Sequence, residues 1–178
     1  LLYLLMQHYI TFFTATILNW KPLLSNDSYK DIIISSFRFL VSDMRADIYA
    51  FVLMPNHLHL LWKIKNDKKY EDVQRDFMKY TAQQIRHRLV KENPGLLKEF
   101  YVGAKDRKYQ IWERNPLSSR LPGEKLIIQK LNYIHANPIS GKWNLCKVFT
   151  DYKYSSAGFY YGYENNWVFL THYADAEM

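Results

Sequence analysis

With 178 residues, the chain is long enough for a sizeable core, and we expect a single domain over residues 1–178. Side chains for that core are abundant, since the chain has 15 Tyr, 10 Phe and 5 Trp. The formal net charge of +7 favours a polyanionic partner. Cys146 is the only cysteine, which excludes an intramolecular disulfide, suits a reducing cytosol and predicts a cytoplasmic protein.

The N-terminal residues 1–6 are apolar, but Gln7 and His8 end this run far short of a membrane span. A basic leader and a small-residue cleavage site are missing, so we expect neither a signal peptide nor a membrane partner. The start at Leu1 suggests that the chain is a piece of a longer gene product.

The first elements are a strand and a helix. Residues 9–17 are dense in aromatic and β-branched side chains, which predicts a strand. Residues 26–28 (Asn-Asp-Ser) offer helix caps, and apolar residues then recur at helical spacing, which predicts a helix over 28–43.

A hairpin follows, with strands expected at 45–54 and 57–65 around a turn at Pro55-Asn56. Successive side chains of a strand point to opposite faces, so His57 and His59 project from one face and Leu58 from the other. Two imidazoles side by side on a rigid strand can share one divalent metal ion. The alternative is a pair of surface histidines without a metal.

A second helix is expected over 71–91, with apolar residues on its inner face and basic residues on another. Residues 96–122 then lack a clear period and mix basic with aromatic side chains, which suits a single-stranded nucleic acid. The alternative for this segment is a surface loop with solvated charges. The candidate DNA-binding residues in these two segments are Arg75, Lys79, Arg86, Lys105, Arg107, Lys108 and Arg114.

A third helix is expected over 124–136, ending at Asn137 because Pro138 follows. Tyr133 and Asn137 are four residues apart and share one helix face, whereas His135 faces away from Tyr133. Taken alone, that face could be an ordinary hydrogen-bonded surface. The aromatic tail after residue 151 has no clear period, and we expect it to pack over the sheet edge.

Two motifs together carry a family resemblance. The sequences PNHLHLLW (residues 55–62) and LNYIHANP (residues 131–138) resemble the single-tyrosine HUH transposases, most closely the bacterial REP-associated tyrosine transposases of the insertion-sequence-200-like family. The similarity extends to the first strand and to DYKYSS at residues 151–156. The chain departs from many relatives at residues 113–117, where those carry a different aromatic and histidine-containing segment.

The resemblance implies an α+β, ferredoxin-like fold, with a central antiparallel sheet and helices packed on one face. It implies that Tyr133 is the nucleophile and that His57, His59 and Asn137 bind a divalent metal, Mg²⁺ or Mn²⁺. The expected activity is cleavage and rejoining of single-stranded or hairpin DNA through a 5′-phosphotyrosine, in DNA transposition or recombination. We expect a monomer or a homodimer.

Two other functions remain open at this stage. The chain could be a metal-dependent phosphodiesterase in which water attacks and Tyr133 is structural. It could also be a non-catalytic, transposase-derived regulator that binds hairpin DNA. A covalent protein–DNA adduct separates the transposase from the phosphodiesterase, and hairpin binding without cleavage identifies the regulator.

Overall fold

The computed structural model describes residues 9–65, 68–163 and 167–176. The strands are β1 (Ile10–Thr16), β2 (Ala46–Met54), β3 (His57–Ile64), β4 (Tyr101–Ala104), β5 (Arg107–Tyr109) and β6 (Leu117–Leu121). The α-helices are α1 (Asp27–Ser42), α2 (Tyr70–Glu92), α3 (Pro94–Lys98), α4 (Glu124–Ala136) and α5 (Ala157–Tyr160). The 3-10 helices are η1 (Leu18–Trp20), η2 (Leu23–Ser25), η3 (Asn137–Ile139), η4 (Phe149–Asp151) and η5 (Tyr173–Asp175). Within the described ranges, no helix is long and apolar enough to cross a membrane.

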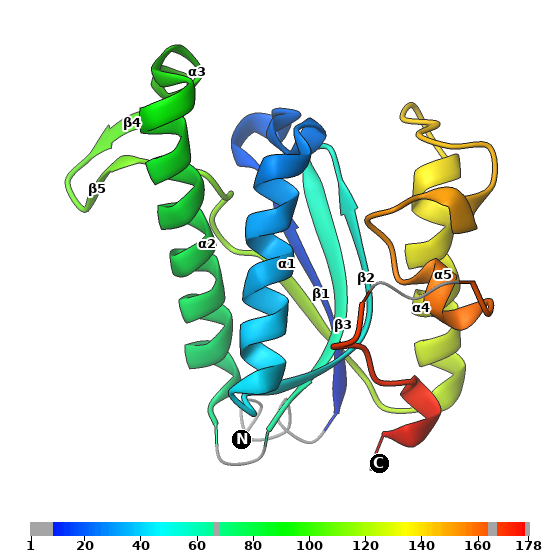
Figure 1. Cartoon of the computed structure of the whole chain (residues 1–178). Coiled ribbons are helices and arrows are strands. Elements are labelled where there is room, and N and C mark those ends of the chain that lie inside the picture. Colours follow the sequence, from blue (N-terminus) through cyan, green and yellow to red (C-terminus); the bar gives the residue numbers. More distant parts are fainter. Residues whose placement is uncertain (1–8, 66–67, 164–166, 177–178) are drawn as a thin grey trace.

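Four strands form one sheet in the order β2-β3-β1-β6, and all neighbouring strands are antiparallel (Figure 1). Helix α1 connects β1 to β2, and α2 lies between β3 and β6 in the sequence, which is the ferredoxin-like β-α-β-β-α-β order. The predicted α+β fold with an antiparallel sheet is therefore confirmed. The expected first strand, hairpin strands and three helices all end within one residue of the expected bounds.

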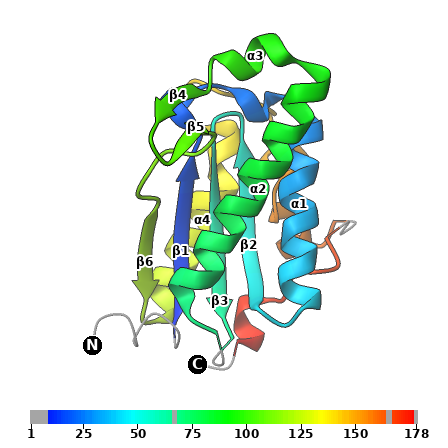
Figure 2. The ribbon, with the colours of Figure 1, turned by 90° about the vertical axis from the view of Figure 1, so that its left-hand side faces the viewer.

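The helices cover both faces of this sheet, so the expectation of helices on one face is wrong. Helices α1 and α2 lie on one face and α4 lies on the other (Figures 1 and 2). The physical reason is visible in β3, where the successive residues Leu60 and Leu61 point to opposite faces and are both fully buried. A sheet that is apolar on both faces needs a cover on each.

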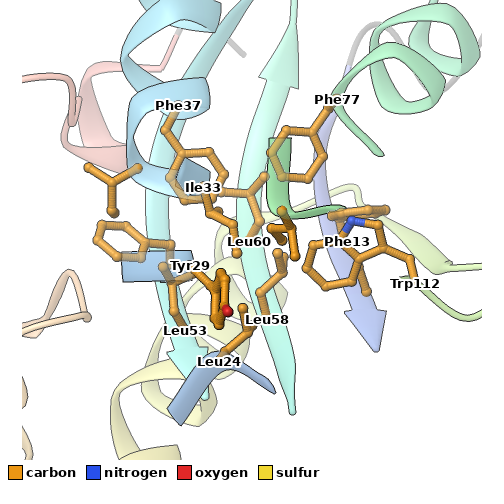
Figure 3. Packing of buried hydrophobic residues seen from close by; sticks show 14 of the residues in the cluster. Phe13, Leu24, Tyr29, Ile33, Phe37, Leu53, Leu58, Leu60, Phe77 and Trp112 are labelled. Carbon is orange, nitrogen blue, oxygen red and sulfur yellow. The ribbon is translucent and has the colours of Figure 1, made fainter. Parts of the chain in front are cut away.

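The larger core lies between the sheet and helices α1 and α2 (Figure 3). Leu58 and Leu60 of β3 and Phe13 of β1 point into it and are fully buried. From the helices, the rings of Phe37 and Phe77 stack with their centroids 5.7 Å apart. Each such side chain stabilises the fold by about 1.5–3 kcal/mol through its burial.

Strand β6 completes the sheet inside the segment expected to be irregular, and the β4–β5 hairpin lies in the same segment. The sequence of β6, Leu-Ser-Ser-Arg-Leu, is short and poor in strand-forming residues. Its pairing comes from β1, where Thr14 stands opposite Leu117 and Ile10 opposite Leu121. The hydroxyl of Tyr70 on α2 also donates to the hydroxyl of Ser118 over 2.8 Å.

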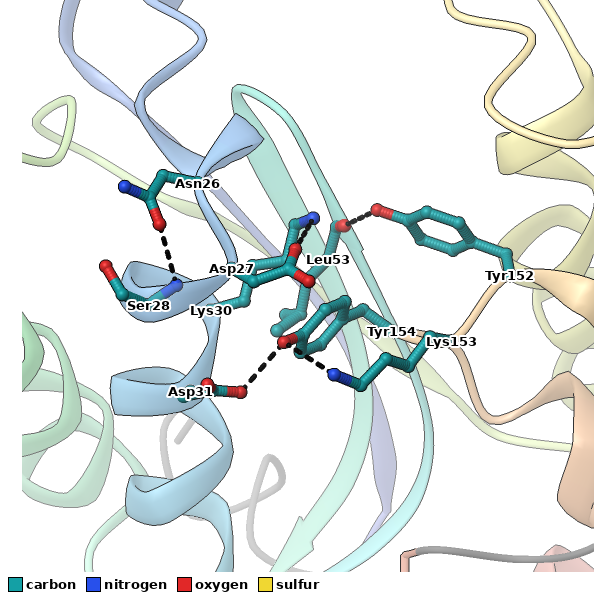
Figure 4. A network of polar contacts seen from close by, with 9 residues as sticks. All are labelled: Asn26, Asp27, Ser28, Lys30, Asp31, Leu53, Tyr152, Lys153 and Tyr154. Atoms are coloured by element: carbon teal, nitrogen blue, oxygen red, sulfur yellow. Dashed lines mark hydrogen bonds and ion pairs between the residues drawn. The ribbon is translucent and has the colours of Figure 1, made fainter.

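The aromatic tail runs along the edge strand β2, as expected. The backbone N–H of Leu53 donates to the carbonyl of Tyr154 over 2.9 Å, and the hydroxyl of Tyr152 donates to the carbonyl of Leu53 over 2.7 Å. The hydroxyl of Tyr154 in turn donates to Asp31 of α1, and the ammonium of Lys30 lies 4.6 Å from the centre of the Tyr154 ring (Figure 4). The tail therefore covers the β2 edge of the sheet, which would otherwise expose unpaired backbone groups.

Candidate functional site

The two histidines of β3 lie on the α4 face of the sheet. Their ring centroids are 4.8 Å apart, while Leu58 between them belongs to the core under α1 and α2. The predicted alternation is thus confirmed. His59 is buried, with 5% of its surface exposed, and His57 is half-buried. This pair is therefore not the pair of solvated surface histidines that the sequence left open.

Each imidazole is oriented by a side chain bound to its Nδ1 atom. Thr14 stands opposite His59 in the β1–β3 register, and its Oγ1 lies 2.8 Å from Nδ1 of His59. Nδ1 of His57 donates to Oδ1 of Asn56 over 2.7 Å. Nε2 of His59 is buried and has no hydrogen-bond partner among the described residues. A buried nitrogen without a partner costs free energy, so this atom calls for a ligand.

Burial keeps both imidazoles neutral. Burial, followed by the proximity of His57 and Lys130, lowers the pKa of His59 to about 3. Burial also lowers the pKa of His57, although a hydrogen bond with the Asn137 side chain partly offsets the change. Neutral imidazoles offer the lone pairs that a metal ion needs.

Tyr133 and Asn137 face the histidines from the end of α4. Tyr133 is half exposed, at 49%, and its ring centroid lies 5.1 Å from that of His59. Nδ2 of Asn137 donates to the carbonyl of Tyr133 over 2.8 Å, and the Asn137 side chain also contacts His57. The four residues that the sequence singled out therefore meet, and Asn137 links the tyrosine backbone to the imidazole.

Phe12 and Lys130 also belong to this site, although the sequence analysis did not assign them to it. The Phe12 ring of β1 stacks on His59 with centroids 5.1 Å apart and meets Tyr133 edge-on. The ammonium of Lys130 lies 4.6 Å from the centre of the Phe12 ring and 5.7 Å from that of Tyr133. Lys130 stands one turn before Tyr133 on α4, and that spacing was the available signal.

His135 lies outside this site, as expected. It is 2% exposed, its Nε2 lies 3.0 Å from the Ser156 hydroxyl, and its ring contacts Tyr160. Burial lowers its pKa to about 4. It is a packing residue between α4 and the tail.

Most of the candidate DNA-binding residues line one groove of about 720 Å³ between α2 and residues 106–116, which we call the basic groove. Its basic residues are Arg75, Lys79, Arg86, Arg107 and Arg114. Lys105 and Lys108 do not line it.

Carboxylates neutralise part of the basic groove. Arg75 pairs with Asp72 and Asp76, and Asp106 pairs with Arg107. Lys79 and Arg86 have no ion pair within the described part of the chain, so these two cations remain available to a ligand. The basic groove thus contains arginines that are paired with carboxylates and two cations that are not.

The basic groove and the histidine site lie on opposite sides of the sheet but meet at its β6 edge. Asn115 and Pro116 line the groove and directly precede Leu117, which pairs with Thr14. Thr14 contacts His59. Figure 2 shows β6 at this edge, between the layers formed by α2 and α4.

The fold is that of a tyrosine transposase. The chain is similar in structure to a REP-associated tyrosine transposase solved bound to a REP hairpin, with a TM-score of 0.64 and 19% sequence identity over 89% of this chain and 84% of the other. It also matches a putative transposase from Deinococcus radiodurans R1, with a TM-score of 0.48 and 16% identity over 71% of this chain and 89% of the other. No curated protein matches its sequence.

Residues 8–113 match the model of the family described as Transposase IS200 like. Because this match spans more than half of the chain, the chain belongs to that family, as the motifs predicted. It is therefore a transposase by family, which implies a DNA-processing enzyme. The matched segment includes His57 and His59 and ends before Tyr133 and Asn137.

Proposed function

We propose that this protein cleaves and rejoins single-stranded DNA through a covalent 5′-phosphotyrosine at Tyr133, with a divalent cation held by His57, His59 and Asn137. The observation that carries the proposal is the buried Nε2 of His59. It has no partner in the described residues, and it belongs to a ring 5.1 Å from that of a half-exposed tyrosine.

The donor set fits a divalent cation such as Mn²⁺ or Mg²⁺. Both imidazoles are neutral and held at Nδ1 by a neighbouring side chain; Nε2 of His59 has no partner within the described residues, and His57 also contacts the Asn137 side chain. The described residues contain no cluster of three or more His, Cys, Asp or Glu that could hold a metal ion. The third protein donor in this proposal is the amide oxygen of Asn137, which the family resemblance implies and whose side chain contacts His57. A cation bound there would act as a Lewis acid on the scissile phosphate and fix its orientation.

Tyr133 supplies the attacking oxygen. Its phenolic oxygen forms a bond to phosphorus, the bond from phosphorus to the 3′ oxygen breaks, and that oxygen leaves as a free 3′-OH with the proton that the phenol gives up. The product is a 5′-phosphotyrosine. A phenol, with an ordinary pKa of about 10, is a good leaving group, so a second 3′-OH can reverse the reaction without an external energy source.

Lys130 supports this step from the same helix. Its ammonium lies over the Phe12 ring and 5.7 Å from the centre of the Tyr133 ring, where it can contact a phosphate oxygen. It adds positive charge where the attacked phosphate becomes more negative, without being a metal ligand.

The DNA that we propose as substrate is a hairpin with a single-stranded flank. The structural neighbour with the higher TM-score was solved bound to a REP hairpin. In this chain, Lys79 and Arg86 of the basic groove are available for phosphates, and the β6 edge leads from there to Tyr133. A flexible single strand can follow that path, and a tyrosine can reach its exposed phosphates.

The test is a covalent adduct. The protein is incubated with 3′-end-labelled hairpin DNA carrying single-stranded flanks, in Mn²⁺ or Mg²⁺, and the products are separated under denaturing conditions. We expect a labelled protein band that is lost in Tyr133→Phe and in excess chelator. Tyr161→Phe is the matched control, because Tyr161 is 51% exposed and lies outside the site.

The outcomes separate the three functions. Cleavage without an adduct would support the metal-dependent phosphodiesterase, and hairpin binding without cleavage would support the regulator. An adduct of full yield in Tyr133→Phe would remove Tyr133 as the nucleophile.

A further inference from the structure

Trp20 is an exposed aromatic side chain at the rim of the histidine site. Its ring lies edge-on to His57 with centroids 6.3 Å apart, yet 63% of the residue is exposed. The other tryptophans differ: Trp62, Trp112 and Trp167 are buried, and Trp143 is half-buried. A large apolar ring left in water beside a polar site is an unusual use of tryptophan.

The backbone that presents Trp20 is strained. Asn19 and Trp20 both have φ of +55°, in the left-handed region that residues with a side chain rarely adopt. Asparagine tolerates this region, but a tryptophan there is an outlier. Strain of this kind persists only where the surrounding structure holds it, and it is concentrated at functional sites.

Hydrogen bonds from two sides hold this conformation. Asn56, whose Oδ1 accepts from His57, donates through Nδ2 to the carbonyl of Trp20 over 3.2 Å. The carboxylate of Glu113 accepts from the backbone N–H of Asn19 over 2.7 Å. Glu113 also lines the basic groove. The Trp20 segment is therefore connected to the histidine on one side and to the groove wall on the other.

We infer that Trp20 is a stacking platform for an unpaired nucleobase of the DNA strand at the histidine site. The inference rests on the proposed function, because it places a single strand there. An indole face offers sequence-tolerant stacking to any base, which suits a strand whose phosphate is aligned on His57. The strained backbone keeps the ring in solvent, where a base can reach it, and away from the core.

A binding experiment without cleavage tests the inference. The probes are a fluorescein-labelled single strand of about twelve mixed nucleotides and a chain of equal length built from abasic units, which keeps the phosphates and lacks the bases. Both are titrated in excess chelator into proteins that also carry Tyr133→Phe. We expect Trp20→Ala to weaken binding of the normal strand roughly five- to one-hundredfold and to leave binding of the abasic strand unchanged.

Matched variants separate stacking from folding and from charge. Trp20→Phe keeps a ring and should retain most of the preference for bases. Phe39→Ala, which removes an exposed aromatic of α1 outside this site, should change neither affinity. Trp20→Gly removes the ring but accepts a positive φ, so it should lose the preference for bases while melting no lower than Trp20→Ala.

Equal weakening of both probes by Trp20→Ala, or no weakening of either, would overturn the inference. Neither result depends on adduct formation, since cleavage is blocked in every protein used. A failure of the covalent mechanism would instead appear as a missing adduct in the separate cleavage test.

Discussion

The two faces of the central sheet come from the same strands, but the side chains that β3 sends to them near its start differ: leucines on one face and histidines on the other. On the α1/α2 face, Leu58 and Leu60 are fully buried in a continuous apolar core. On the α4 face, His57 and His59 alternate with them, and the buried Nε2 of His59 has no partner in the described residues. Both faces bury apolar side chains that stabilise the fold, and the α4 face also holds a buried imidazole nitrogen whose missing partner costs free energy that a ligand would offset.

The difference shows how a rigid sheet can carry a reactive site. Strand β3 is central, with β2 and β1 on either side, so the histidine backbone is fixed by two ladders of hydrogen bonds. The leucine side of the strand supplies the burial that holds those ladders together. Substitutions on alternate residues of one strand can then separate function from stability.

The largest effect is expected from alanine substitutions at two neighbouring residues of β3 that point to opposite faces of the sheet. His59→Ala should reduce cleavage by about a hundredfold or more, since it removes a proposed metal ligand and the aromatic partner of Tyr133. Leu60→Ala should instead lower the free energy of unfolding by about 2–5 kcal/mol, because it leaves a cavity in the core, and should keep cleavage where the protein is folded. Cleavage rates and urea unfolding of both variants check this. Normal cleavage in His59→Ala would contradict the separation of the two faces.

The next effect concerns pH and the buried imidazoles of the α4 side. Burial lowers the pKa of His135 to about 4. The pKa of His59 is lowered to about 3, mainly by burial. In the unfolded chain, a histidine has a pKa near 6.5. Below pH 6.5 the unfolded chain binds more protons than the folded one. The contribution of these neutral imidazoles to the free energy of unfolding is therefore complete above pH 6.5. It is lost as the pH falls towards 4, by up to roughly 3 kcal/mol for His135.

His135→Gln tests this loss, because glutamine keeps a polar group for Ser156 and does not titrate. Urea unfolding from about pH 7.5 to about pH 4.5, in chelator, should show a shallower decline in the variant. The same decline in both proteins would mean that His135 is not the titrating group.

A smaller effect is expected at Asn137, which also has a purely structural use as a partner of the Tyr133 carbonyl. If its amide oxygen binds the cation, Asn137→Ala should raise the Mn²⁺ concentration at half-maximal cleavage by about tenfold. Asn137→Asp keeps an oxygen donor and adds charge, so its midpoint should stay the same or fall. Equal midpoints in wild type and both variants would limit Asn137 to its structural use.

The smallest effect is expected in the basic groove. Neutralising Arg75, Lys79 and Arg86 with glutamine should reduce the slope of log affinity against log salt by roughly 1.4, at about 0.7 for each of the two cations, Lys79 and Arg86, that have no ion pair within the described residues. Lys105→Gln with Lys108→Gln is the control, since these lysines lie outside the groove. An unchanged slope in the groove variant, or a larger change in the control, would place the DNA on another surface.

Helices and strands with a regular pattern of apolar residues could be predicted from the sequence. An element that forms only because another segment pairs with it could not. The helices and the histidine hairpin have regular apolar patterns, and their expected bounds are within one residue of those observed. Strand β6 is a strand because β1 and α2 bind it, and Leu-Ser-Ser-Arg-Leu alone does not indicate one. The cover on both sheet faces depends on where α4 packs, which local patterns do not specify.

The site divides in the same way. His57 with His59, and Tyr133 with Asn137, show short, regular spacings in the sequence, and the family resemblance of the two motifs implied that the four residues form one site. Phe12, Thr14 and Trp20 join the site only through pairing between distant segments: Thr14 reaches His59 across 45 residues of sequence. Contacts of that kind appear only once the sheet register is known.

The central claim is that Tyr133 becomes covalently linked to DNA, and peptide mapping of the adduct tests it most directly. Trypsin cleavage after Lys130 and Lys142 releases residues 131–142, a peptide in which Tyr133 is the only tyrosine. After nuclease digestion of the DNA, we predict that this peptide carries a nucleotide joined through its 5′-phosphate, and that His59→Ala protein gives none. A nucleotide on another peptide, or cleaved DNA with no modified peptide, would contradict the account.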